Sequence, residues 1–404
     1  MSEWKEVRLG DLCYKVCSGG TPKSTCSSYY EGGTIPWLNT KEINYNRIFE
    51  TESHITEDGL NHSSAKWIDS NAVVVAMYGA TAGRVAIAKV PMTTNQACCN
   101  LMIDSSKADY NFIYYYLSNS YKYLLSMANG AAQQNLNAQI IKDLFISLPS
   151  LDEQRSIASI LSSLDSKIEN NRKICANLEA QAQVLFKHWF IDFAPFKDGK
   201  FVESELGMIP EGWRVGKLGD VTEFLNGFAF KSSSFVSKGK YKVITIKAVQ
   251  DGKLITDSAD EIEDLSLNIP SHCVLKIGDI LLSLTGNVGR VCIVTQDNLV
   301  LNQRVCILNP RNLIDRGYVY TLSRTKLLKT RMINIAKGTA QANLSPVETS
   351  KLSIVVPPRY ILDKFGIIAN EYMSEIISAY QENQRLSSLR DTLLPKLMSG
   401  AIKV

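Results

Sequence analysis

Apolar residues recur at alternating steps of four and three in two long stretches of the chain. The first stretch carries this series at Ile157, Leu161, Leu164, Ile168, Asn171, Cys175, Leu178, Ala182, Leu185 and Trp189. The second carries it at Phe365, Ala369, Tyr372, Ile376, Ala379, Asn383, Leu386, Arg390, Leu393 and Leu397. A mean spacing of three and a half residues is typical of coiled-coil helices, so the pattern predicts two long helices with apolar seams.

The two seams match each other when the helices run antiparallel and facing residue numbers sum to 554. Ile157 then faces Leu397, and the polar member of one seam, Asn171, faces the polar member of the other, Asn383. A buried Asn pair can set the register of such a pair at some cost in stability. We therefore expect an antiparallel pair of helices, each about 38 residues or roughly 55–60 Å long. The alternative is that each helix packs only on its own globular unit.

The stretches before each helix have a different pattern, with short apolar runs interrupted by Gly, Asn and Ser. VVVAMYG (73–79) and DILLSLTG (279–286) are β-rich runs that end in glycine. Such runs predict strands followed by tight turns, and GNVGRV (286–291) is best interpreted as a hairpin turn.

The chain also repeats itself at a nearly constant shift. Trp4 returns as Trp213 (213 − 4 = 209) and Gly83 as Gly289 (289 − 83 = 206). Further matching pairs are Asn95-Gln96 with Asn302-Gln303, GAAQQNL (130–136) with GTAQANL (338–344), and Leu148-Pro149 with Val356-Pro357. The markers stay in order, so the protein contains two copies of one unit of about two hundred residues.

These patterns together predict an α+β protein with two similar α/β domains, an antiparallel two-helix spacer and a pseudo-twofold internal repeat. The expected parts are a first domain at 1–150, a spacer helix at 151–192, a linker at 193–212, a second domain at 213–358 and a second spacer helix at 359–404. Ser150 and Glu153 form a capping-box pattern at the start of the first helix.

Composition excludes few functions. The chain has 404 residues, a net charge of +4 and 45% hydrophobic residues, which describe an ordinary globular protein with at most a weak preference for nucleic acid. Its nine cysteines form no Cys-x-x-Cys pair, so we expect free thiols in a reducing cytoplasm and no metal site. The N-terminal residues lack the apolar core of a signal peptide, and no run is long enough to span a membrane.

Several motifs together resemble the specificity subunit of type I restriction–modification systems. In the first repeat they are SGGTPK (18–23), IPWLN (35–39), GATAGRVAIA (79–88), NQA (95–97), GAAQQNL (130–136), LPSLDEQRSIASIL (148–161) and LEAQAQVLFKHWF (178–190). In the second they are GMIPEGW (207–213), GNVGRV (286–291), NQR (302–304), GTAQANL (338–344) and LLPKLMSG (393–400). The second repeat departs from the first before its helix, where PPRYILD (357–363) stands in place of the Asp-Glu-Gln stretch.

The resemblance implies that each domain is a target-recognition domain that reads one half of a bipartite site in double-stranded DNA. It also implies that two methyltransferase subunits dock on the helical spacer and that restriction subunits join a larger complex. Two unlike recognition domains on a rigid spacer would bind two unlike half-sites with a fixed gap.

Catalytic motifs are missing from the sequence. Asn309-Pro310-Arg311-Asn312 lacks the second proline and the aromatic residue of an amino-methyltransferase motif, and no glycine-rich cofactor loop opens a helix. We therefore expect a chain that binds DNA without catalysing a reaction and without a cofactor. Two alternatives remain: a self-contained DNA modification enzyme, and a coiled-coil scaffold with two protein-binding modules.

DNA contacts then have to come from polar, cationic and aromatic residues in the loops of the two domains. Candidates in the first domain are Ser18, Thr21, Lys23, Lys41, Arg47, Tyr78, Arg84 and Gln133. Candidates in the second are Lys231, Lys247, Arg290, Gln303, Arg304 and Gln341. Any one of them is alternatively a solvated or structural residue. Residues shared by the repeats suit phosphate contact or folding, so base reading is expected where the repeats differ, for example at 39–66 and 241–256.

Overall fold

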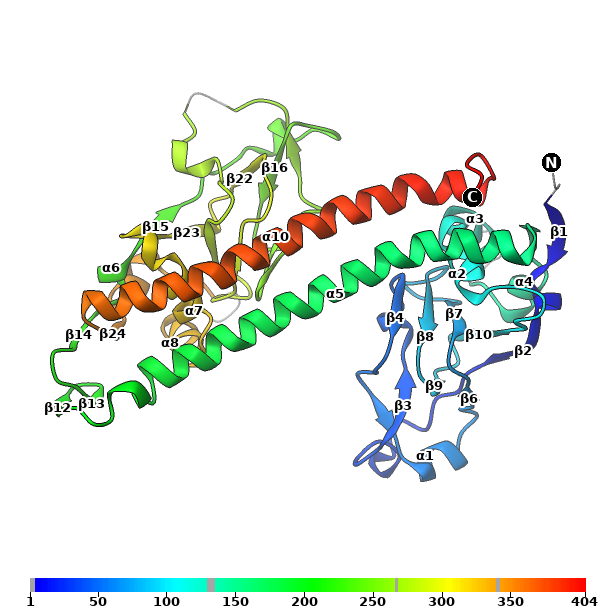
Figure 1. Ribbon diagram of the computed structural model, residues 1–404, viewed down its shortest axis with the longest axis horizontal. Coiled ribbons are helices and arrows are strands. Elements are labelled where there is room, and N and C mark those ends of the chain that lie inside the picture. The colour runs from blue at the N-terminus through cyan, green and yellow to red at the C-terminus, as the bar shows by residue number, and fades with distance from the viewer. Residues whose placement is uncertain (1–3, 129–134, 266–267, 339–341) are drawn as a thin grey trace. The chain divides into compact units, whose positions relative to one another are not determined.

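The computed structural model describes residues 4–128, 135–265, 268–338 and 342–404 of the protein. The chain divides into two compact units (Figure 1). Unit 1 comprises Met1–Ser166 with Leu386–Val404, and unit 2 comprises Lys167–Arg385. Each unit combines sheets with helices, so the predicted α+β class with two repeated domains is confirmed.

Unit 1 is built around a five-stranded sheet with the order β2-β10-β7-β8-β4. Its strands are β2 (Cys13–Ser18), β10 (Cys98–Ile103), β7 (Ala72–Ala76), β8 (Val85–Ala88) and β4 (Asn46–Ile48). A second sheet contains β5 (His54–Ile55), β3 (Ile35–Leu38), β9 (Met92–Thr94) and β6 (Trp67–Ile68), in that order. A separate antiparallel pair joins β1 (Lys5–Arg8) to β11 (Phe145–Leu148).

Unit 2 repeats this plan with a four-stranded sheet of order β15-β23-β20-β21. Its strands are β15 (Thr222–Asn226), β23 (Val305–Pro310), β20 (Ile280–Ser283) and β21 (Val291–Ile293). The smaller sheet has β19 (Glu261–Ile262), β16 (Tyr241–Ile244) and β22 (Leu299–Leu301). Paired strands complete the unit: β14 (Arg214–Lys217) with β24 (Ser353–Val356), β17 (Val249–Gln250) with β18 (Lys253–Leu254), and β12 (Phe201–Ser204) with β13 (Gly207–Pro210).

The two units share their strand topology. The order β2-β10-β7-β8 in unit 1 corresponds to β15-β23-β20-β21 in unit 2, and every neighbouring pair is antiparallel. Each smaller sheet contains one parallel pair, β3 with β9 and β16 with β22. GNVGRV connects β20 to β21, which pair antiparallel, so the predicted hairpin turn is confirmed.

Short helices accompany the sheets in both units. Unit 1 has α1 (Glu57–Asn61), α2 (Tyr110–Asn119), α3 (Tyr121–Ala128) and α4 (Ala138–Lys142), and unit 2 has α6 (Leu218–Val221), α7 (Arg316–Ser323), α8 (Lys326–Ile335) and α9 (Pro346–Ser350). The 3-10 turns are η1 (Leu9–Leu12), η2 (Ser27–Tyr29), η3 (Thr40–Glu42), η4 (Ala194–Phe196), η5 (Ser232–Ser234), η6 (Ser271–Cys273) and η7 (Leu313–Asp315).

Helix α2 was not predicted, because the sequence pattern indicates short strands in the stretch before the first long helix. Its tyrosines and phenylalanine favour strands by propensity. A helix forms instead because Asp109 caps it, its carboxylate accepting hydrogen bonds from the amides of Asn111 and Phe112. Burial of its aromatic face in the core of unit 1 then stabilises it.

The two long helices are α5 (Leu151–Phe190) and α10 (Arg359–Met398). Ser150 caps α5, because its hydroxyl accepts a hydrogen bond from the amide of Glu153 at 3.3 Å. None of the twenty predicted seam positions is exposed. Among the described residues, no helix is long and apolar enough to cross a membrane.

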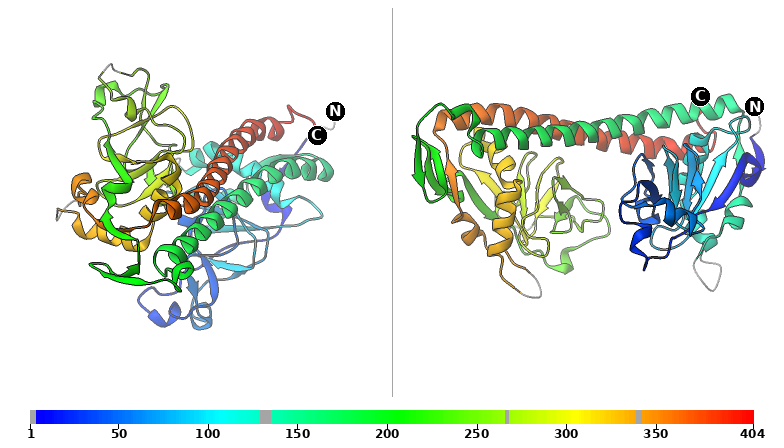
Figure 2. Two further views of the ribbon diagram at one scale, coloured as in Figure 1. Left: turned by 60° about the vertical axis from the view of Figure 1, so that its left-hand side comes forward. Right: turned by 90° about the horizontal axis from the view of Figure 1, so that it is seen from below.

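Within each unit, α5 and α10 run antiparallel (Figures 1 and 2). In unit 2 the amide of Asn171 donates to the Oδ1 of Asn383 at 3.0 Å, which is the predicted pairing, and it also donates to Glu382 at 2.6 Å. The rings of Trp189 and Phe365, another pair that sums to 554, lie 6.0 Å apart.

The core of each unit includes the start of one long helix and the end of the other. In unit 1, Ile157 and Leu161 of α5 pack in the same cluster as Leu397 of α10. In unit 2, Phe186 and Phe190 of α5 pack in a cluster with Phe365 of α10 and its neighbours. Each globular unit is therefore completed by a helix from the other repeat.

The Asn171–Asn383 layer yields a stability prediction. Replacing Asn171 alone by Leu leaves the buried amide of Asn383 without its partner, so unfolding free energy should fall by roughly 1–3 kcal/mol. Replacing both by Leu removes the unpaired group and should recover most of that loss. Urea unfolding of the full chain measures both values, with Asn170→Leu, an exposed position one residue away, as the control. A double variant less stable than the single one would contradict the role of this layer.

Candidate DNA-binding interface

Three loops of unit 1 are held together by backbone hydrogen bonds. The segment after β2 joins the loop after β9, because the amide of Gly20 donates to the carbonyl of Thr94 at 2.8 Å. That loop joins the end of β3, because the amide of Asn95 donates to Leu38 at 3.0 Å. The indole of Trp37 closes the set by donating to the carbonyl of Gly20 at 2.9 Å.

The hairpin turn between β7 and β8 lies at the same end of the sheet. In the ladder, Ala76 of β7 faces Cys98 of β10, and Cys99 faces Ser18 of β2. The amide of Met77 donates to the carbonyl of Ala97 at 2.8 Å. The loops after β2, β3, β7 and β9 therefore lie together, and we call them the unit 1 loop cluster (18–23, 38–42, 77–84 and 94–97).

Unit 2 builds the equivalent cluster from equivalent bonds. The amide of Phe228 donates to Leu301 at 2.9 Å, and that of Asn302 donates to Ile244 at 3.1 Å. The amide of Leu284 donates to the carbonyl of Arg304 at 3.0 Å. The unit 2 loop cluster thus comprises 226–231, 244–247, 284–290 and 302–304.

Two glycines show how closely the backbones approach in both clusters. A Cβ added to Gly19 would lie 2.1 Å from the carbonyl oxygen of Thr94, and one added to Gly227 would lie 2.1 Å from that of Asn302. Any side chain at either position would push the loops apart. This need for glycine explains why the two repeats agree here although their neighbours differ.

The repeated heptapeptides end at equivalent places. The amide of Leu136 donates to the carbonyl of Met77 at 2.9 Å, and that of Leu344 donates to Leu284 at 2.7 Å. The two leucines therefore dock on the same turn of each unit. Gln133 and Gln341, the candidate residues of these heptapeptides, lie outside the described residues.

Most of the other candidate residues fall within the two loop clusters. Those of unit 1 are Ser18, Thr21, Lys23, Lys41, Tyr78 and Arg84, and those of unit 2 are Lys231, Lys247, Arg290, Gln303 and Arg304. Five candidates are exposed, and their side chains form no hydrogen bond or ion pair with any described residue: Lys23, Lys231, Lys247, Gln303 and Arg304. Their side chains are available for an external partner. Four of the five, the three lysines and Arg304, are positively charged.

Other candidates already have partners within the protein. The guanidinium of Arg84 donates to Asn44 at 2.9 Å, and that of Arg290 donates to Gln250. Lys41 forms an exposed ion pair with Glu52 at 2.7 Å, which raises the pKa of the lysine. Thr21 donates to the side chain of Gln96. DNA contact by these groups would require an exchange of partners or the use of remaining donors.

Arg47 lies apart from the unit 1 loop cluster. It belongs to β4, and its guanidinium donates to the carbonyl of Ser162 and the hydroxyl of Ser166, both at 2.9 Å. These bonds tie the edge strand of the sheet to α5. The sequence did not indicate this anchoring, because it depends on a helix more than a hundred residues away.

A charged network makes a similar connection in unit 2. Arg324 pairs with Glu179 of α5 at 2.5 Å and with Asp251, in the turn between β17 and β18, at 3.1 Å. Burial, together with the Glu179 charge and hydrogen bond, raises the pKa of Tyr320 well above its usual value, so this phenol stays protonated and donates to Glu179. The segment 241–256, where base reading was predicted, is thus held against a rigid helix.

Gln96 was missed by the sequence analysis. It is exposed in the unit 1 loop cluster and occupies the place of Gln303 in the second repeat. The repeated Asn-Gln pair was visible in the sequence and was the signal that could have identified it.

Comparison with known proteins decides the family. Residues 1–180 and 210–388 each match the family described as type I restriction modification DNA specificity domain. The chain belongs to the type I restriction–modification specificity family. Two matches on one chain also agree with the internal repeat.

Relatives match this specificity subunit over its whole length. The type I restriction enzyme MjaIX specificity subunit of Methanocaldococcus jannaschii is 31% identical and covers 100% of this chain and 94% of its own. The HindI specificity subunit of Haemophilus influenzae is 22% identical and covers 100% of both. The crystal structure of a type I S subunit from M. genitalium has a TM-score of 0.56 at 20% identity, over 98% of this chain and 96% of its own, and so shares the fold.

The exposed lysines of the two loop clusters generate a prediction about DNA affinity. Lys23→Ala and Lys231→Ala should each remove about one phosphate contact. The plot of log association constant against log salt concentration should then become less steep by roughly 0.9 per lysine. The preferred DNA sequence should not change, because both repeats carry this lysine. Fluorescence anisotropy over a salt series, on the chain with its modification subunit, measures the slope. Lys197→Ala, an exposed lysine outside both clusters, is the control, and equal slopes in all variants would refute the assignment.

Proposed function

We propose that this specificity subunit reads a bipartite DNA sequence, one half-site with each loop cluster. The observation that carries the proposal is that the same arrangement of loops occurs twice with different side chains. Thr21 stands where the second repeat has Ala229, and Ala97 where it has Arg304, whereas Lys23 and Lys231 are the same. Shared lysines suit the uniform phosphate backbone, and differing residues suit two different base sequences.

The long helices act as spacer and docking surface in this proposal. Two modification subunits bind along α5 and α10, and restriction subunits join the larger complex. The predicted division of the chain into domains at 1–150 and 213–358, spacer helices at 151–192 and 359–404, and a linker at 193–212 serves this function. A helical spacer sets a fixed gap between half-sites, since the spacing of recognition elements sets the spacing of their sites.

The chain itself contributes recognition and no catalysis in this proposal, and it requires no cofactor. Methyl transfer belongs to the modification subunits and DNA cleavage to the restriction subunits. The complex works in the cytoplasm, where the chromosome of a prokaryotic cell is accessible.

Exchange of one recognition domain tests the proposal. Residues 213–358 are replaced by the corresponding domain of the MjaIX relative, and the chimera is expressed with its modification subunit. Sequencing that detects methylated bases should show one half-site changed and the other kept, because each domain reads only its own half. The parental chain provides the reference, and a chimera with residues 1–150 replaced should change the opposite half-site.

The outcome separates this function from its alternatives. Alteration of both half-sites by a single exchange would contradict independent reading. Methylation without any sequence enrichment would indicate a scaffold, and methylation by the isolated chain would indicate a self-contained enzyme.

A further inference from the structure

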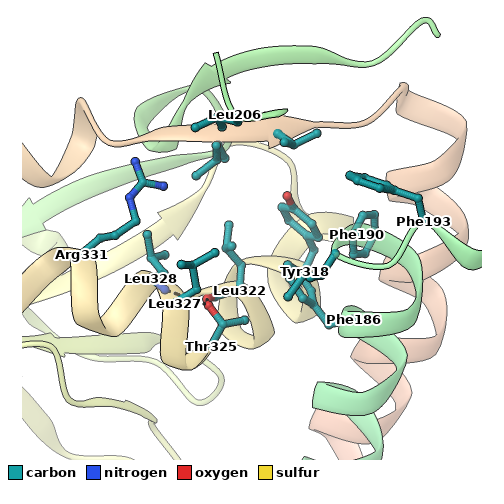
Figure 3. Close-up of a pocket in the computed structure, with 13 residues that line it drawn as sticks. Phe186, Phe190, Phe193, Leu206, Tyr318, Leu322, Thr325, Leu327, Leu328 and Arg331 are labelled. Carbon is teal, nitrogen blue, oxygen red and sulfur yellow. Dashed lines mark hydrogen bonds between the residues drawn. The ribbon is translucent and has the colours of Figure 1, made fainter. Parts of the chain in front are cut away.

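An apolar pocket of about 400 Å³ opens in unit 2, beside the end of α5 (Figure 3). Its walls come from Phe186 and Phe190 of α5, Tyr318 and Leu322 of α7, and Val355 of β24. This volume is within the range of sites that accept a small molecule or a large side chain. Most of the lining is apolar, so the pocket favours an apolar occupant.

One polar group is aimed into this pocket without a partner. Tyr318 is 1% exposed, and Figure 3 shows its hydroxyl directed into the space. Its hydroxyl forms no hydrogen bond with any described residue. Burial, reinforced by Asp315, raises the pKa of Tyr318, so the group remains a neutral O–H donor. The hydroxyl faces the open pocket, so it can donate a hydrogen bond to an oxygen acceptor of an occupant.

The first repeat carries an aromatic ring at the position of Leu322. A shift of 206 places Tyr116 opposite Leu322 and Phe112 opposite Tyr318. In unit 1 the phenol oxygen of Tyr116 accepts a bond from the amide of Ser147 at 3.4 Å, and the rings of Tyr116 and Phe112 lie 6.3 Å apart. Unit 2 has the smaller Leu322 there, and a hydroxyl where unit 1 has none. Unit 2 therefore has room for an aromatic ring at this position.

The rim of the pocket is apolar and exposed, with one cation. Leu327 is 61% exposed, Ile191 44% and Leu206 40%. The guanidinium of Arg331 lines the pocket and donates to the carbonyl of Ser353 at 2.6 Å, but it pairs with no described carboxylate. Clustered apolar exposure around a pocket is typical of protein interfaces, whose strongest anchors are aromatic. The cation favours an occupant with an acidic group next to its ring.

We infer that this pocket receives an aromatic side chain, with a neighbouring carboxylate, from one modification subunit. The inference rests on the proposed function, because the pocket wall is continuous with the α5 surface assigned to docking. The ring takes the place that Tyr116 fills in unit 1, its polar atom accepts from Tyr318, and the carboxylate pairs with Arg331. Because unit 1 has Tyr116 where unit 2 has Leu322, the anchor described here belongs to unit 2.

A small probe tests the ring site in the full chain. Saturation-transfer NMR with p-cresol and with toluene should detect both in the wild-type chain. Leu322→Tyr, which restores the ring found in unit 1, should weaken both about tenfold. Tyr318→Phe should weaken p-cresol severalfold and leave toluene unchanged. Undiminished binding of both probes to Leu322→Tyr would overturn the pocket as a ring site.

Docking is tested with the purified modification subunit by calorimetric titration. Leu322→Tyr should weaken association about tenfold, whereas Leu313→Tyr, which adds the same ring at a 70% exposed position, should not change it. Leu327→Asp on the rim provides a second variant if Leu322→Tyr fails to fold. Unchanged association in both pocket variants would overturn the inference.

Three further results distinguish this inference from the proposed function. A dimer of the isolated chain that Leu322→Tyr dissociates would make a second copy the occupant and overturn the inference. Methylation of the same bipartite sequence at saturating modification subunit is expected for Leu322→Tyr, because the loop clusters are unchanged. Loss of the sequence preference in the wild-type complex would instead refute the proposed function.

Discussion

The packing of one long helix into the core built by the other repeat is the interaction on which this structure depends. In unit 2, Phe186 and Phe190 at the end of α5 belong to the main cluster, and the rings of Phe190 and Phe365 lie 4.9 Å apart. In unit 1, Leu397 and Met398 at the end of α10 belong to the cluster of Leu9 and Phe112. Apolar burial of this kind contributes about 25 cal/mol per Å². Neither repeat completes its own core, so the two copies depend on each other for stability.

The first long helix also anchors segments that lie outside the two loop clusters. Arg47 joins β4 to α5 in unit 1, and the Glu179–Arg324–Asp251 network joins the β17–β18 turn to α5 in unit 2. The two connections use different residues. In both units a segment of the domain is thereby fixed to a long helix, and a rigid base of this kind suits the proposed reading of two unlike half-sites.

The two repeats share backbone contacts but differ in their side chains. Gly19 and Gly227 allow the same close backbone approach, and Leu136 and Leu344 dock on the same turn in the two units. In contrast, the same place in the fold carries Tyr116 in unit 1, which accepts a hydrogen bond from Ser147, and Leu322 in unit 2, which lines a pocket. The two repeats therefore have the same backbone arrangement but different surfaces.

The sequence by itself determined the repeat, the two long helices and the register of Asn171 with Asn383, because these follow from spacing along the chain. Helical periodicity is a local property, and matching two seams requires only arithmetic. Helices inside the units, such as α2, were not predicted from the sequence. Their composition favours strands, but N-terminal capping and burial stabilise a helix instead.

Only the tertiary structure decided which candidate residues are available to a partner. Lys23 and Lys231 are exposed, whereas Arg47 is committed to Ser162 on a distant helix. The pocket at Tyr318 was invisible in the sequence for the same reason. Exposure and pairing depend on segments that approach one another only in the folded chain, and no spacing along a single strand or helix encodes them.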